Sequence, residues 1–305
     1  MTRLEVKPQT WKLKELPRLI QKVEGFPAIL AALEAGHSAT IDGAWGSSCA
    51  LAAAALAERV PRTLFVVASH VSDVDDLCDD IATFLGRRVQ SFAAWERLPL
   101  EELVADEIYG QRLRLLKSLS ADPPPTVVVT SIQALLQPVP SPDSIVRHSR
   151  RLQVGEVAPL DELLRWLVDQ GFIRRDAVEL PGEISLRGGI LDVFPPDLSA
   201  PIRIEYFGDE IESIRSFDIE TQRSAEQFTS LSVTAAKTQP LDEAAKSNPE
   251  DLVHLCAYAK PGSWFMLIEP HDLTEQGRHY LDRLDDPRGC FNDEGSLKQV
   301  LQFPS

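Results

Sequence analysis

The chain has 305 residues, 44% of them hydrophobic and 25% charged, which is typical of a globular protein of roughly two or three domains. Its 46 acidic and 31 basic residues give a net charge of −15, which argues against non-specific DNA coating, because phosphates require a basic surface. No apolar run approaches the about 18–20 residues that span a membrane. Residues 1–16 carry no apolar signal core, so we expect a cytoplasmic protein.

The residues that usually hold metals are scattered along the chain. The cysteines form no C-x-x-C pair and the histidines form no H-x-x-x-H pair. We therefore expect buried free thiols, and neither a zinc site nor a disulfide framework.

Short apolar segments alternate with amphipathic segments in residues 1–143. This alternation, with entirely apolar stretches such as residues 127–129, predicts an α/β fold whose parallel sheet is covered on both faces. The predicted strands are Ser38–Ile41, Thr63–Ala68, Val89–Phe92 and Thr126–Thr130, and the predicted helices are Phe26–Ala35, Cys49–Arg59, Ser72–Leu85 and Asp106–Leu119.

Residues 43–50 lie between a predicted strand and a predicted helix, which is the setting of a phosphate-binding loop. Such a loop reads G-x-x-x-x-G-K-[ST], where the lysine contacts phosphates and the hydroxyl binds Mg²⁺. Gly43 and Gly46 are present, but Ser48 replaces the second motif glycine, Cys49 the lysine and Ala50 the hydroxyl residue. The segment indicates a degenerate phosphate loop; the alternative is a plain strand–helix turn.

Three prolines, at positions 138, 140 and 142, predict a domain boundary there, because proline removes backbone donors and restricts its neighbours. Residues 144–236 then predict an α+β domain. Its expected elements are a strand at His148–Leu152, a helix at Leu160–Leu167 and strands at Ala177–Leu180, Ile190–Phe194, Ile202–Phe207 and Glu210–Phe217. Residues 237–305 predict a linker, a buried strand at Trp264–Ile268 and a helix near Leu273–Leu284, without any closing element.

The segment Ile202–Phe207 alternates apolar and polar residues, as a strand with one buried face does. Residues 202, 204 and 206 are expected to be buried, which places Arg203, Glu205 and Phe207 outward. An exposed aromatic beside arginines is typical of an interface hot spot, and Arg187 precedes the neighbouring strand. The alternative is that Phe207 tucks under the turn and Arg203 and Glu205 form a solvated pair.

Residues 186–196 (LRGGILDVFPP) and 201–218 (PIRIEYFGDEIESIRSFD) resemble the interaction domain of bacterial transcription-repair coupling factors. They are also similar, less closely, to the second domain of UvrB. Residues 94–99 (AWERLP) and 112–116 (RLRLL) resemble the first domain of coupling factors. The degenerate loop favours the coupling factor, because UvrB has an intact one. Glu269, after the strand at Trp264–Ile268, offers one acid where an ATPase motif has two.

The resemblance implies a UvrB-like module: domain 1a at 1–143, an inserted UvrA-interaction domain at 144–236, and an incomplete return to the first domain at 237–305. Arg187, Arg203 and Phe207 match the family's UvrA-contact surface, which favours their outward placement. The implied function is recruitment of UvrA to stalled RNA polymerase in transcription-coupled nucleotide excision repair.

The full-length relatives are implied to be ATP-dependent translocases on double-stranded DNA. Nothing in this chain matches those parts, so we expect no catalytic residue and no ATP or Mg²⁺ here. The chain resembles an N-terminal portion of such a factor. Two alternatives remain: a UvrB-like ATP-dependent helicase, which would need a lysine where Cys49 stands, and an autoinhibitory domain whose UvrA-facing surface is masked.

Overall fold

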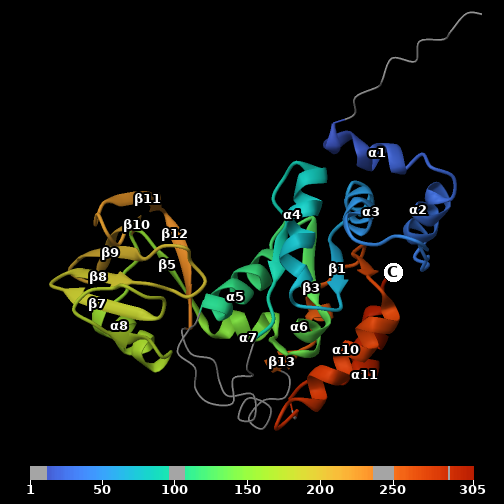
Figure 1. The fold of residues 1–305 in the computed structure, drawn as a ribbon. Coiled ribbons are helices and arrows are strands. Elements are labelled where there is room, and N and C mark those ends of the chain that lie inside the picture. Colours follow the sequence, from blue (N-terminus) through green and yellow to red (C-terminus); the bar gives the residue numbers. More distant parts are fainter. Residues whose placement is uncertain (1–11, 96–106, 236–250, 288) are drawn as a thin grey trace, which may run out of the picture.

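The computed structural model describes residues 12–95, 107–235, 251–287 and 289–305, and they form two units, each built on its own sheet (Figure 1). The first, the parallel-sheet unit, has a four-stranded sheet in the order β14-β1-β3-β2, with parallel neighbours throughout. Its strands are β1 (Leu64–Ala68), β2 (Gln90–Phe92), β3 (Val127–Ser131) and β14 (Trp264–Leu267).

Helices cover both faces of this sheet, because alternate residues of its buried strands point to opposite sides. One face packs against α2 (Phe26–Glu34), α3 (Ser47–Ala57) and α4 (Asp73–Leu85). The other packs against α5 (Glu107–Ser120), α6 (Ile132–Leu136), α10 (Pro270–Asp282) and α11 (Asp293–Val300). The predicted parallel sheet with two covered faces is therefore confirmed.

The strand predicted at Ser38–Ile41 is wrong. The end of the chain lies alongside β14 instead: Phe265 N donates to Pro304 O at 2.9 Å, and Ala39 N donates to Ser305 O at 2.8 Å. Residues 38–41 thus meet the terminal residues and pair with none of the sheet's strands. Apolar composition alone does not make a strand, because a strand also needs a hydrogen-bonding partner.

The second unit, the mixed-sheet unit, has a six-stranded sheet in the order β11-β10-β9-β8-β7-β6. Only β6 and β7 pair in parallel. Its inner face packs on α8 (Leu160–Asp169) and on the small sheet formed by β5 and β12. The strands are β5 (Ser149–Gln153), β6 (Ile173–Arg174), β7 (Glu183–Arg187), β8 (Ile190–Val193), β9 (Ile202–Phe207), β10 (Glu210–Phe217), β11 (Ser224–Phe228) and β12 (Ser230–Thr234).

The strand predicted at Ala177–Leu180 is also wrong, and β7 occupies Glu183–Arg187 instead. The Glu183 carboxylate accepts hydrogen bonds from the backbone N–H groups of Glu179 and Leu180, at 2.9 and 3.0 Å. A side chain thus satisfies donors that a strand would offer to its neighbour, and residues 177–180 stay irregular.

Helix α5 joins the two units through polar contacts that are at least partly buried. Lys117 Nζ lies 2.5 Å from the carboxylate of Asp197, whose side chain is only 1% exposed, and Thr234 donates to the same oxygen at 3.1 Å. Arg114 donates to the carbonyl of Pro196 at 3.2 Å. The mixed-sheet unit is therefore held at α5 by an ion pair as well as by the chain connections.

The remaining elements are short. They are η1 (Leu13–Glu15), α1 (Leu16–Ile20), β4 (Val139–Pro140), α7 (Pro142–Arg147), β13 (Leu252–Val253) and η3 (Leu255–Tyr258). The described part of the chain holds no helix with the length and apolar character needed to cross a bilayer.

Candidate functional site

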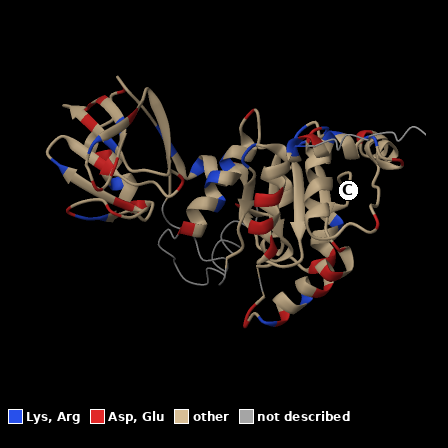
Figure 2. Ribbon diagram, turned by 45° about the horizontal axis from the view of Figure 1, so that its top comes forward, with Lys and Arg blue, Asp and Glu red and all other residues tan. Residues whose placement is uncertain are grey.

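The outer face of the mixed sheet carries the residues that the strand pattern placed outward. In β9, Ile202, Ile204 and Tyr206 are buried, and Phe207 is 79% exposed. Phe207 therefore does not tuck under the β9–β10 turn. Charges of both signs are interspersed over this unit in Figure 2, so it does not present a uniformly basic surface.

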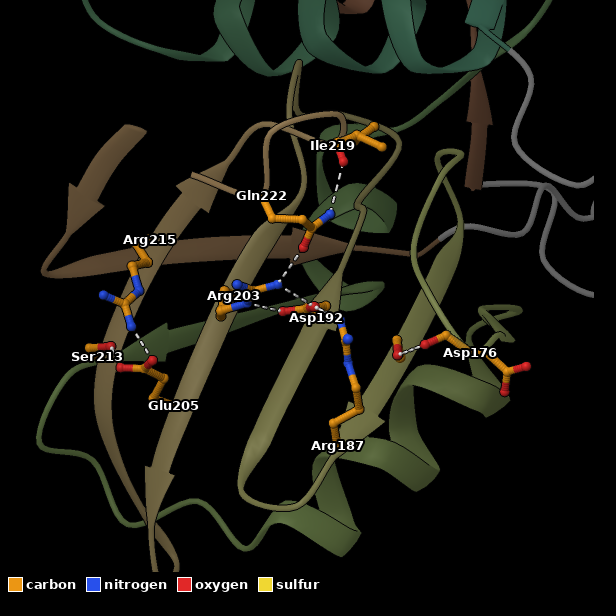
Figure 3. Close-up of polar contacts among 10 residues, drawn as sticks. Asp176, Arg187, Asp192, Arg203, Glu205, Ser213, Arg215, Ile219 and Gln222 are labelled. Atoms are coloured by element: carbon orange, nitrogen blue, oxygen red, sulfur yellow. Dashed lines mark hydrogen bonds and ion pairs between the residues drawn. The ribbon is translucent and has the colours of Figure 1, made fainter. Parts of the chain in front are cut away.

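Asp192, on β8, is the buried centre of this face, with a side chain that is only 2% exposed. Its carboxylate accepts two hydrogen bonds from Arg203, from Nε at 2.7 Å and from Nη2 at 2.8 Å (Figure 3). Arg187 Nη2 donates to the same carboxylate at 3.2 Å. One buried acid thus brings together two arginines from β7 and β9, because residues 192 and 203 are direct cross-strand partners.

Arg203 is the better held of the two arginines. Its side chain is 18% exposed, whereas that of Arg187 is 58% exposed. The Arg203 guanidinium lies over the ring of Phe217, 4.4 Å from its centroid, and Nη2 also donates to Gln222 Oε1 at 3.0 Å. Hydrogen bonding to Asp192 raises the pKa of Arg203 above its ordinary value, against the opposing effect of burial.

Glu205 has its own partners on β10. Ser213 Oγ donates to the Glu205 carboxylate at 2.7 Å, and Arg215 forms an ion pair with it. The Ser213 hydroxyl lowers the pKa of Glu205, with burial opposing it and Arg215 adding to the decrease. The alternative in which Arg203 and Glu205 form a solvated pair is therefore wrong.

Strand alternation located Arg203 and Phe207 on one face, and the structure places Arg187 on the same face, joined to Arg203 through Asp192. It also brings in Asp192 and Gln222, which the sequence argument did not single out. Asp192 had a signal: a carboxylate between two apolar residues of a strand predicts a polar side chain on the opposite face. Gln222 had none, because it lies in the loop after β10.

The degenerate loop begins α3. Gly43 and Gly46 have positive φ angles of 77° and 55°, which glycine adopts without strain. Ser48 Oγ accepts from Trp45 N at 2.8 Å and donates to Trp45 O at 2.7 Å, so its hydrogen bonds close within the loop. Cys49 and Ala50 are buried, with exposures of 6% and 0%. Burial raises the pKa of the Cys49 thiol, and the charge of Glu269 raises it further.

A pocket of about 520 Å³ lies beside this loop, along β14 and the residues that follow it. Its lining includes Gly43, Cys49 and Glu269, so the chain folds the degenerate loop and the single acid against one space. Among the described residues that line it, the charged side chains are Asp42 and Glu269, and none is basic. These lining residues do not fit a nucleotide, because they include no lysine or arginine side chain to bind its phosphates.

Metal binding finds no support in the described ranges, where no three His, Cys, Asp or Glu side chains gather closely enough to hold an ion. The outer face of the mixed sheet is thus the site with the clearest chemistry, because one face carries an exposed aromatic and two arginines that share one buried acid.

Comparison with known proteins relates the segment that carries this face to a known domain family. Residues 151–238 match the family model of the UvrB interaction domain. This segment of the chain is similar to a UvrB interaction domain. All strands of the six-stranded sheet lie inside the matched segment. The domain boundaries predicted after residues 143 and 236 stay predictions.

Longer stretches of the chain are similar to transcription-repair-coupling factors. The chain is 33% identical to that of Bacillus subtilis over 231 residues, which are 74% of this chain and 19% of the relative. The factor of Mycobacterium bovis is 38% identical over 57% of this chain and 14% of the relative. The factor of Escherichia coli is 30% identical over 70% of this chain and 19% of the relative. The chain is therefore homologous to these factors, but it spans less than a fifth of their length.

Proposed function

We propose that this chain is the part of a transcription-repair coupling factor that recruits UvrA, and that it does so through the outer face of its interaction domain. The observation that carries the proposal is Phe207, which is 79% exposed at the end of β9, on the sheet face that also carries Arg187 and Arg203. Large aromatics and arginines dominate binding energy at protein interfaces. The family match and the homologous coupling factors support the choice of partner.

Each residue has a distinct role in this proposal. Phe207 is the apolar anchor, because its ring leaves water only when a partner covers it. Arg187, whose side chain is 58% exposed, donates charge-assisted hydrogen bonds to acceptors on UvrA. Arg203 adds a second guanidinium that the protein already holds in place.

The same proposal assigns no ATP chemistry to this chain, since buried Cys49 stands at the position of the phosphate-binding lysine. RNA polymerase, double-stranded DNA and ATP-driven translocation would belong to other parts of a full-length factor. An autoinhibitory role is compatible, because masking would act on the same outer face.

The test is calorimetric titration of the chain with UvrA. Phe207→Ala should weaken binding by ~2 kcal/mol or more, about thirtyfold in Kd, because truncating a central anchor has that effect. Trp45→Ala is the matched control, since Trp45 is 78% exposed but lies in the degenerate loop of the other unit. Circular dichroism should show both variants folded.

Unchanged affinity of Phe207→Ala would remove this face from the UvrA interface. Equal losses in Phe207→Ala and Trp45→Ala would show that the effect does not depend on the outer face of the mixed sheet.

A further inference from the structure

Gln222 stands out on the outer face because it has a positive φ angle of 56° without being glycine. Such a backbone conformation costs free energy for a residue with a side chain, and it persists only where surrounding contacts hold it. Here Gln222 Nε2 donates to Ile219 O at 2.9 Å, and Gln222 N donates to Asp218 O at 2.8 Å. These bonds turn the amide oxygen toward Arg203 (Figure 3).

The Arg203 guanidinium is consequently fixed by three neighbours. Asp192 engages Nε and Nη2, Gln222 engages Nη2 again, and the Phe217 ring lies against the guanidinium plane. Within the described residues, Nη1 is the one nitrogen of the Arg203 guanidinium that makes no hydrogen bond. Two arginines against one carboxylate also leave one positive charge at this point of the surface.

We propose that Asp192 and Gln222 are positioning residues, which hold Arg203 so that its Nη1 edge binds a carboxylate side chain of the partner. The inference rests on the proposed function, because it takes UvrA as the partner. A fixed arginine loses less conformational freedom on binding than a mobile one, so pre-organisation strengthens each hydrogen bond that it makes. The excess positive charge favours an anionic acceptor over a neutral one.

The decisive variant is Gln222→Gly in the full chain, with UvrA as the binding partner. Glycine relieves the positive φ, which offsets the two lost amide hydrogen bonds and the greater freedom of glycine in the unfolded chain, so the melting temperature should change little. Binding should nevertheless weaken by about threefold to tenfold, which corresponds to one lost hydrogen bond. A merely structural residue would instead lower the melting temperature and binding together.

Two further variants separate backbone from side chain. Gln222→Asn tolerates the left-handed backbone but is too short to reach Arg203, so it should bind as weakly as Gln222→Gly. Glu269→Gly is the matched control, because Glu269 also has a positive φ, of 51°, but lies in the parallel-sheet unit. It should bind UvrA as the wild type does.

A double-mutant cycle tests whether Gln222 acts through Arg203. Arg203→Lys keeps a charge beside Asp192 and loses the fixed guanidinium, so adding Gln222→Gly to it should cause no further loss. Additive losses in the cycle would overturn the positioning role. So would wild-type binding by Gln222→Gly while Phe207→Ala binds weakly, and the proposed function would then stand. Wild-type binding by both single variants would overturn the positioning role and the proposed function together.

Discussion

The Arg203–Asp192 pair leads to a prediction about stability: Arg203→Ala should destabilise the mixed-sheet unit strongly. Asp192 is a carboxylate with 2% of its side chain exposed, and two of the three hydrogen bonds that it receives from arginines come from Arg203. Removing one partner of a buried ion pair leaves a charge without compensation, which costs about 3–5 kcal/mol.

Two local effects adjust this value. Arg187 stays 3.2 Å from the carboxylate and brings the cost toward the lower end. The loss of the guanidinium over Phe217 adds roughly 0.5–1 kcal/mol. We therefore expect Arg203→Ala to lower the free energy of unfolding by about 3.5–4 kcal/mol, a large part of the roughly 5–15 kcal/mol of a typical domain.

Native-state hydrogen exchange is the appropriate assay, because peptides from β8 to β10 report on this unit alone in a chain that has two units. Arg187→Ala is the matched control. Its side chain is 58% exposed and makes one contact with Asp192, so its loss should cost less than about 1 kcal/mol. Equal protection in the two variants would refute the role of the buried pair. The result also decides how binding data are interpreted, since Arg203→Ala alters the fold and Phe207→Ala does not.

Two further predictions concern stability in other parts of the chain. Burial lowers the pKa of His254 from 6.5 to about 4. As the pH falls, the His254 imidazole is therefore protonated in the unfolded chain before it is protonated in the folded one. The contribution of His254 to the free energy of unfolding should be full above pH 6.5, and up to about 3 kcal/mol of it should be lost toward pH 4. Urea titrations of His254→Gln should lack this pH-dependent loss. Lys117→Met removes the ion-pair partner of buried Asp197 and should lower the free energy of unfolding by about 3 kcal/mol. The double variant Lys117→Met/Asp197→Asn should recover part of this loss. An unchanged urea midpoint for Lys117→Met would contradict the prediction.

The sequence by itself determined the features that depend on local periodicity. Alternation along Ile202–Phe207 determined which side chains of β9 face outward, because successive residues of a strand point to opposite faces. The apolar run at 127–129 predicted a strand buried on both faces, and β3 is fully buried. The residue types in the degenerate loop showed the missing lysine and hydroxyl without any knowledge of the fold.

Only the tertiary structure decided the partners. Arg203 pairs with Asp192 on the adjacent strand and with Gln222 in a later loop, whereas its neighbour Glu205 binds Arg215. These choices depend on strand register, which results from packing across the whole sheet and does not appear in one segment. The same reason explains the missing strand at Ser38–Ile41: whether an apolar segment becomes a strand depends on which part of the chain lies beside it, and here the terminal residues do.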